Sequence, residues 1–222
     1  MNNPMKPIIF NSEMVLAILN GKKTQTRRVV PIDWVQSSKE PLLTHGVGGI
    51  WHFWNSGEHQ SKYQIDDILY IRESFRPFTN ITLCTEDVGI VYKADGEARV
   101  WSASIEDAYS AFAHVWKPSI FLPKKFSRIF VKVVDIKIER LNSISEEDAV
   151  AEGVKRYGIG GYEDYTNSEY YTTSARSSFL GLWESIHKKD KFSSDSNPWV
   201  FVYRFEKVEI KTLPFSIVER GM

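Results

Sequence analysis

Two long runs of strand-forming residues limit the folds that are open to this chain. Residues 128–140 (RIFVKVVDIKIER) are the longest strand candidate, and residues 199–210 (WVFVYRFEKVEI) have the composition of a central strand. Shorter candidates, such as residues 6–10 and 68–73, are irregularly spaced, and the βαβα alternation of a nucleotide-binding fold is missing. This pattern predicts an α+β protein in which a small closed or nearly closed β-barrel has helices at its ends.

Three short helices are predicted beside these strands, and a fourth is predicted over residues 105–114. Apolar residues recur at helical spacing in residues 13–20. A second helix should cover about residues 146–152, because Ser145 offers an N-cap and Gly153 ends the pattern. An amphipathic pattern marks the third helix with four apolar residues, Phe179, Leu182, Trp183 and Ile186.

The composition excludes several classes of site. The chain has 222 residues with 28 basic and 28 acidic side chains, so its overall charge does not indicate a nucleic-acid partner. The single cysteine, Cys84, excludes an intrachain disulfide and any cysteine-rich zinc site, including that of the zinc deaminases that act on nucleobases. His45, His52 and His59 recur without the carboxylates or thiolates of a defined ligand set, so we expect no metal and no cofactor.

The start of the chain and its hydropathy indicate the compartment. MNNPMKPIIF lacks the apolar segment of a signal peptide, and no apolar run approaches the length of a membrane span. We therefore expect a cytoplasmic protein without a membrane partner.

A basic stretch directly follows the first predicted helix. Residues 21–28 read GKKTQTRR, and their glycine is placed to end that helix. In an extended chain, Thr26 and Arg28 project to one side, whereas Gln25 and Arg27 project to the other. The stretch is therefore either a polar surface that serves a site or an ordinary helix end with solvated basic residues.

Four motifs, in this order, make the chain resemble the ASCH family, whose fold is a β-barrel related to the RNA-reading PUA domain. They are GKKTQTRR at residues 21–28, DDILYIRE at residues 66–73, LNSISEEDAVAEG at residues 141–153 and WVFVYRF at residues 199–205. The chain is most similar to the longer, phage- or prophage-type members of the family.

The resemblance implies a single ASCH, PUA-like domain over residues 1–210, followed by a C-terminal tail at residues 211–222. Compared with the small family members, the chain has insertions near residues 31–62, 77–117 and 155–173. These insertions could reshape or cover the substrate site, so the family's chemistry is expected to transfer more readily than its substrate.

The best understood family members are small bacterial enzymes that hydrolyse the amide of N4-acetylcytidine to cytidine and acetate. Their catalytic Lys and Thr lie in the basic stretch, and their catalytic Glu lies in the later helix. By motif position, the resemblance implies that the corresponding residues of this chain are Lys23, Thr26 and Glu152.

The residue types fit this chemistry, because amide hydrolysis needs a nucleophile, a base and a donor that faces the developing oxyanion. The Thr26 hydroxyl needs an adjacent base, and Lys23 can serve if burial and neighbouring cations lower its pKa. Glu152 could transfer the proton or orient the lysine. Five further residues are candidates for binding the substrate: Arg28, Arg72, Glu73, Lys117 and Ser119.

Two functions from different classes are therefore expected. The first is an amidohydrolase for an acylated pyrimidine nucleoside, in which Arg28 or Arg72 holds an acyl oxygen or a phosphate. The second is a non-catalytic reader of RNA or other single-stranded nucleic acid, which uses the same cleft and stacks the aromatic side chains of the insertions on the bases. Both arginines are equally compatible with structural ion pairs, and Glu73 could bind a base edge or pair with Arg72.

Overall fold

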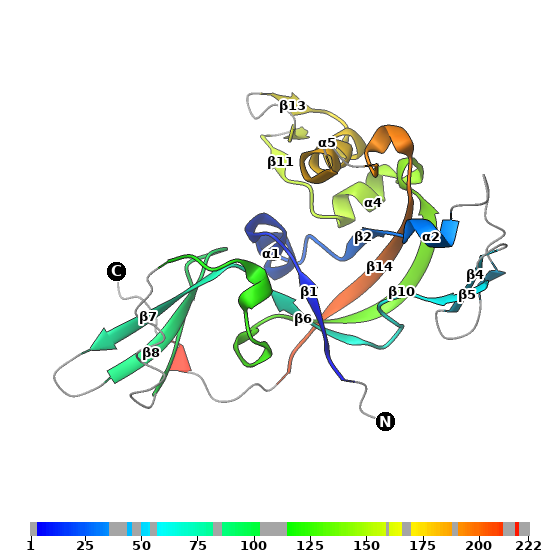
Figure 1. Ribbon diagram of the computed structural model, residues 1–222. Coiled ribbons are helices and arrows are strands. Elements are labelled where there is room, and N and C mark those ends of the chain that lie inside the picture. The colour runs from blue at the N-terminus through cyan, green and yellow to red at the C-terminus, as the bar shows by residue number, and fades with distance from the viewer. Residues whose placement is uncertain are drawn as a thin grey trace. The chain divides into compact units, whose positions relative to one another are not determined.

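The computed structural model describes residues 4–35, 44–45, 50–53, 57–81, 86–102, 115–158, 160–165, 170–187, 191–210 and 216–217. It contains both helices and sheets, which confirms the α+β class (Figure 1). A helix able to span a membrane is not found among the described residues.

The chain divides into two compact units that interleave in sequence. Unit 1 comprises Met1–Leu19, Ile68–Val131 and Lys207–Met222, and unit 2 comprises Asn20–Asp67 and Lys132–Glu206. The predicted single domain over residues 1–210 stays a prediction. Most of the predicted tail lies outside the described residues, as do Cys84 and residues 103–114 of the second predicted insertion.

Unit 1 contains a parallel strand pair and an antiparallel sheet. β1 (Lys6–Ile9) pairs in parallel with β6 (Ile68–Arg72), and α1 (Ser12–Leu19) follows β1. The antiparallel sheet has the order β15-β9-β8-β7, with the bounds Ser216–Ile217, Ala98–Ser102, Glu86–Tyr92 and Phe75–Ile81. Two 3-10 helices complete the described part of this unit, η1 (Ser119–Phe121) and η2 (Lys124–Phe126).

Unit 2 is organised around β14 (Trp199–Val208), which lies between β10 (Phe130–Arg140) and β2 (Gln25–Val29). The division between the units falls within β10. Four consecutive residues of β14, numbers 200–203, are buried, as expected for a strand that is covered on both faces. The predicted central strand is therefore confirmed.

The other elements of unit 2 are short helices and two small antiparallel sheets. The helices are α2 (Ile32–Val35), η3 (Leu141–Ser143), α4 (Glu146–Ala151), α5 (Ala175–His187) and η4 (Ser194–Ser196). The sheets are β3-β4-β5 (Thr44–His45, Ile50–Phe53, Gly57–Gln60) and β11-β12-β13 (Arg156–Tyr157, Gly161–Glu163, Tyr171–Thr172). The first and third predicted insertions therefore contain regular structure, although their sequences lack a steady period.

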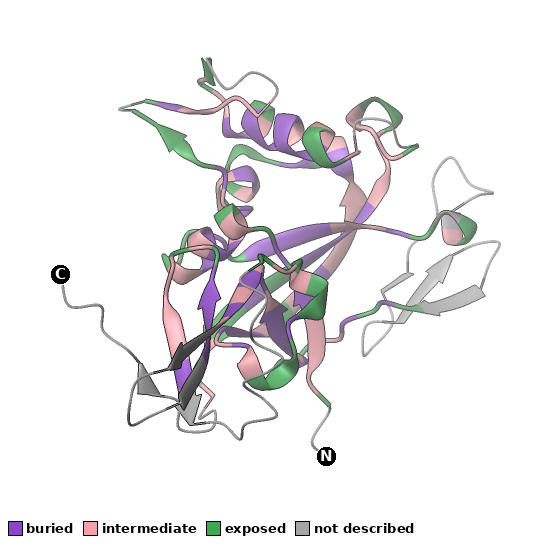
Figure 2. Cartoon of the chain, turned by 60° about the vertical axis from the view of Figure 1, so that its left-hand side comes forward, coloured by how far each residue is buried: buried purple, intermediate pink, exposed green. Residues whose placement is uncertain are grey.

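Three of the four predicted helices are present, and the fourth, over residues 105–114, lies outside the described residues. In α4 the Ser145 hydroxyl accepts a hydrogen bond from the Asp148 amide at 3.0 Å, and Gly153 has a φ of 85°, so both predicted ends are confirmed. In α5, buried residues, among them Phe179 and Trp183, are interspersed with partly buried and exposed ones (Figure 2). The prediction is wrong for Ile186, which is 58% exposed because the buried cluster of unit 2 ends at Trp183 along this helix.

In unit 2, α4 and α5 cover one side of β14 and β2, which we call the helical face. Val200 and Val202 of β14 belong to a core cluster with residues of these helices and of the adjoining segments, namely Leu141, Ile144, Ala149, Val154, Ala175, Phe179 and Trp183. Arg27 pairs with Val202 across the two antiparallel strands, so its side chain lies on this face.

The opposite side of the same strands is the aromatic face. Tyr203 lies opposite Thr26 and Phe201 lies opposite Arg28, which places Thr26 and Arg28 on this face. The Tyr63 ring packs on Tyr203 with the centroids 5.1 Å apart. The predicted alternation along residues 25–28 is therefore confirmed.

None of the described sheets closes on itself. The strand order of each sheet ends in two different strands, and β2 is an edge strand of its sheet. The coarse prediction of a mixed helix and sheet protein is confirmed, whereas a PUA-like barrel is not found among the described residues.

Candidate functional site

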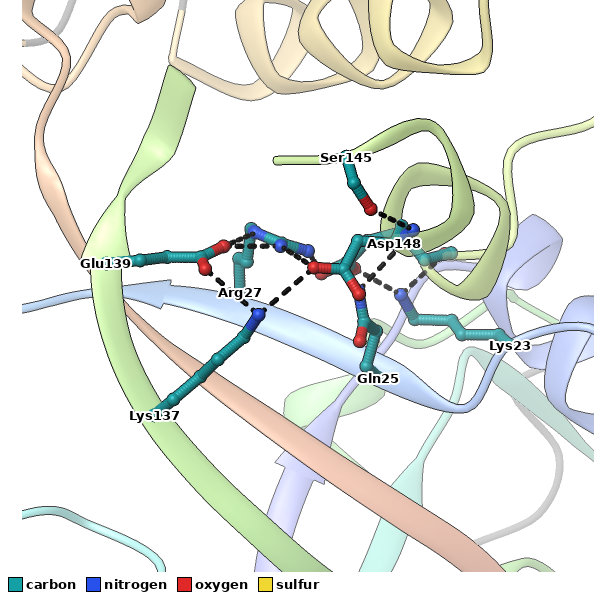
Figure 3. A network of polar contacts seen from close by, with 8 residues as sticks. Lys23, Gln25, Arg27, Lys137, Glu139, Ser145 and Asp148 are labelled. Atoms are coloured by element: carbon teal, nitrogen blue, oxygen red, sulfur yellow. Dashed lines mark hydrogen bonds and ion pairs between the residues drawn. The ribbon is translucent and has the colours of Figure 1, made fainter. Parts of the chain in front are cut away.

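A buried ionic network lies on the helical face of unit 2, with Arg27 at its centre (Figure 3). The Arg27 side chain is 0% exposed. Its Nη1 donates to Oε1 of Glu152 at 2.9 Å, and its Nη2 donates to Oε1 of Glu139 at 2.5 Å and to Oδ2 of Asp148 at 3.1 Å. Arg27 therefore connects β2 to both β10 and the end of α4.

Lys23 shares the Glu152 carboxylate with Arg27. The Lys23 Nζ donates to Oε2 of Glu152 at 2.8 Å and to the Glu152 backbone oxygen at 2.7 Å, and the two side chains are 1% and 3% exposed. Burial lowers the pKa of the Lys23 ammonium; the Glu152 charge opposes this shift, and the charges of Arg28 and Arg27 add to it. Lys23 therefore loses its proton more readily than a solvated lysine.

The network is balanced in charge within the described residues. Lys137 of β10 contacts Oδ2 of Asp148 at 3.1 Å and Oε2 of Glu139 at 3.0 Å. Burial alone would raise the pKa of the Asp148 carboxyl, but hydrogen bonds and charges of Lys137 and Arg27 hold it below its ordinary value. Three cations face three carboxylates, which is the arrangement that buried charges need to be tolerated.

The basic stretch satisfies backbone groups at the end of α4. The last carbonyls of a helix have no partner within the helix, and cations near them are favoured by the helix dipole. Here the Thr24 backbone amide donates to the Ala151 carbonyl oxygen at 2.9 Å. The Gln25 side-chain amide donates at 2.8 Å to the Asp148 carbonyl oxygen, which also accepts from the Glu152 backbone amide. The solvated interpretation of this stretch is therefore wrong for Lys23 and Arg27, although Lys22 is exposed.

Thr26 and Arg28 lie on the other face of β2 from Arg27. Thr26 is 3% exposed, and no hydrogen bond of its hydroxyl is found within the described residues. Burial lowers the pKa of the Arg28 guanidinium, whereas the nearby Tyr63 and Glu152 oppose this shift. The structure thus brings Lys23 and Glu152 together, and no hydrogen bond joins Thr26 to either of them among the described residues.

Two of the predicted substrate-binding residues form internal contacts in unit 1. Arg72 donates through Nη1 to the Ile120 oxygen at 3.0 Å. Glu73 forms a two-bond ion pair with Arg128, with distances of 2.8 and 2.9 Å from Nε and Nη2. The alternative pairing of Glu73 with Arg72 is therefore wrong, because Arg128 approaches Glu73 from a residue 55 positions away in the sequence.

The last two predicted substrate-binding residues also lie in unit 1. Lys117 forms two backbone hydrogen bonds with Phe75, at 2.7 and 3.2 Å. Ser119 begins η1. Their backbones are thus part of the scaffold of unit 1, and their roles in binding stay predictions.

Sequence reasoning missed Arg27, Glu139, Asp148 and Lys137 as members of the network. Two local signals were present. Lys137 and Glu139 are two residues apart on one strand and so share a face, and Asp148 and Glu152 are four residues apart at the end of one helix. That these two faces meet Arg27 depends on the tertiary fold.

The chain matches no family model, no curated protein and no solved structure. The resemblance to the ASCH family therefore rests on the sequence motifs alone.

Proposed function

We propose that the protein is a cytoplasmic amidohydrolase of the PUA-like ASCH type, which removes the acyl group of an N4-acetylcytidine-like nucleoside. The observation that carries the proposal is the buried pair of Lys23 and Glu152, with Nζ and Oε2 2.8 Å apart. Perturbed ionisable groups are a physical marker of functional sites, and burial lowers the pKa of the Lys23 ammonium, which favours a role as a base.

In the proposed reaction, neutral Lys23 accepts the Thr26 proton while the hydroxyl oxygen bonds to the acyl carbon. The carbon–nitrogen bond breaks, N4 of the cytosine takes the proton from Lys23, and Thr26 is left acylated. Water then attacks this ester, and its proton passes through Lys23 to the Thr26 oxygen as acetate leaves. Thr26 forms no hydrogen bond with Lys23 among the described residues, so the proposed transfer requires the two side chains to come within hydrogen-bond distance in the substrate complex.

Glu152 and Arg28 have supporting roles in this proposal. A neutral amine has two N–H bonds, which is enough to keep both hydrogen bonds from Lys23 to Glu152. Glu152 thus orients the amine and stabilises the ammonium that forms. Arg28 shares the aromatic face with Thr26 and holds the acyl oxygen or a phosphate of the substrate.

Hydrolysis of N4-acetylcytidine, followed by the ultraviolet change on deacylation, tests the proposal. The purified protein should turn over, and Lys23→Met should lower kcat by about 10²–10⁴-fold because the base is lost. Lys22→Met is the matched control, because Lys22 is exposed at the neighbouring position and should not affect turnover. A folded wild-type protein that does not hydrolyse this compound would contradict the proposed reaction.

Binding of single-stranded nucleic acid is the second candidate function, and the observation that favours it lies in unit 1. Trp116 is 41% exposed, and its ring centroid lies 5.4 Å from Cζ of Arg76 and 6.0 Å from Nζ of Lys93. Neither cation pairs with a carboxylate within the described residues. An exposed indole beside these two cations suits a base that stacks and a phosphate that binds.

This second function predicts that a labelled single-stranded oligonucleotide binds, and that its affinity falls steeply as salt rises. Trp116→Ala should weaken binding by about 1–3 kcal/mol for the loss of one stacked base. Tyr170→Ala is the control, because Tyr170 is also an exposed aromatic residue (62%) but belongs to unit 2. Fluorescence anisotropy measures the affinity. If the wild type and Trp116→Ala bind the oligonucleotide equally well, the surface around Trp116 is excluded as the binding site.

A further inference from the structure

The contacts of the Glu152 carboxylate separate its two oxygens. Oε1 accepts from Arg27 at 2.9 Å, and Oε2 accepts from Lys23 at 2.8 Å. The terminal bond of a glutamate side chain rotates over a broad range unless contacts restrict it. A strong, charge-assisted bond to Oε1 therefore determines where Oε2 points.

Arg27 is itself immobilised by groups other than Glu152. Its guanidinium donates to Glu139 of β10 and to Asp148 of α4, and its Cζ lies 5.6 Å from the centre of the Phe179 ring. Contacts from three elements on a planar, five-donor group leave it one orientation. The position of Oε1, and with it that of Oε2, is thus set from the helical face of unit 2.

We infer that Arg27 is a positioning residue, which orients the Glu152 carboxylate so that Oε2 faces the Lys23 amine. This inference rests on the proposed function, in which the Lys23 amine is the base. Arg27 lies on the face of β2 opposite to Thr26 and acts through Glu152 without touching the reacting atoms.

The charge of Arg27 also affects the ionisation of Lys23. Among the described residues, the Glu152 charge favours the Lys23 ammonium, whereas the charges of Arg28 and Arg27 favour the neutral amine. Removal of the Arg27 charge should therefore raise the pKa of Lys23, whereas a lysine at the same position should preserve it.

Titration of the Lys23 side chain by ¹³Cε chemical shift tests the inference without relying on catalysis. We expect a midpoint at higher pH in Arg27→Met than in the wild type, and a midpoint close to the wild type in Arg27→Lys. Arg176→Met is the matched control, because Arg176 is a partly buried arginine of unit 2 that donates to the Asn142 oxygen. An unchanged midpoint in folded Arg27→Met would overturn the inference.

Kinetics on the same variants provide the second readout. Arg27→Lys keeps the positive charge but loses the planar guanidinium that holds Oε1. Because a displaced catalytic group can slow the reaction about a hundredfold, kcat should fall by about this factor while KM stays unchanged. Wild-type kcat in Arg27→Lys would refute the positioning role even if Arg27→Met fails to fold. Absence of turnover in the wild type would instead refute the proposed function, and the titration would still show whether Arg27 acts on Lys23.

Discussion

Replacement of Thr26 by valine is expected to abolish hydrolysis of N4-acetylcytidine and to leave the fold intact. Valine keeps the β-branched shape that suits β2 and removes only the hydroxyl. No hydrogen bond of that hydroxyl is found within the described residues, so no described partner is left unsatisfied. Loss of the nucleophile should lower kcat by at least about 10⁴-fold, whereas the free energy of unfolding should change by less than about 1 kcal/mol.

Thr24→Val is the matched control for this experiment. Thr24 is an exposed threonine two residues earlier, and its contacts to Ala151 and Phe205 use backbone atoms only. This variant should keep wild-type turnover. If Thr26→Val keeps wild-type kcat as well, the proposed acyl-threonine step is wrong, and the base would have to activate water directly.

Replacement of Arg128 by methionine is expected to lower the free energy of unfolding by about 3–5 kcal/mol. The side chains of Arg128 and Glu73 are both 1% exposed, and Arg128 also contacts Asp95 and Glu97 at 2.8 and 2.7 Å. Its Cζ lies 4.1 Å from the centre of the Tyr92 ring. Without Arg128, the Glu73 carboxylate stays buried without a counter-charge. A buried charge without its partner strongly destabilises the folded state.

The pH dependence of this variant identifies Glu73 as the cause. Burial raises the pKa of the Glu73 carboxyl, and Arg128 opposes the shift. A carboxyl with a raised folded pKa contributes stability that is present below its unfolded pKa and is lost as pH rises through the folded pKa. Arg128→Met should therefore lose less stability at about pH 5 than at about pH 7, measured by urea unfolding.

The double variant Arg128→Met with Glu73→Met provides the control. It removes both buried charges and should recover most of the lost stability, because apolar residues often replace a buried ion pair at little cost. If the free energy of unfolding of Arg128→Met is within about 1 kcal/mol of the wild-type value, the assigned role of Arg128 is wrong.

Local patterns in the sequence determined much of the fold. Ser145 and Gly153 marked the ends of α4 because caps depend on side chains within one turn of the helix. The density of large apolar residues identified β14 as a central strand. The alternation along β2 was also predictable, because side chains of any strand alternate with a period of two.

Part of the candidate site was predictable for a different reason. Lys23 and Glu152 are 129 positions apart, and their pairing followed from the motif order of a resembling family rather than from residue chemistry. Thr26 followed from the same motif, yet the structure places it on the opposite face of β2 from Arg27. The spacing of a motif predicts which residues belong to a candidate site, but it does not predict the distances between their atoms.

Only the tertiary structure decided which partners the charged residues take. The sequence placed Arg27 on the side of β2 opposite to Thr26 and Arg28, but only the structure shows that α4 and α5 cover that side and make Arg27 the buried centre of the network. Glu73 has Arg72 beside it in the sequence, yet it pairs with Arg128, which is 55 positions away. The partner of a buried charge depends on which faces of the helices and strands pack against each other. The sequence predicts which residues share a face, but it does not predict which faces come into contact.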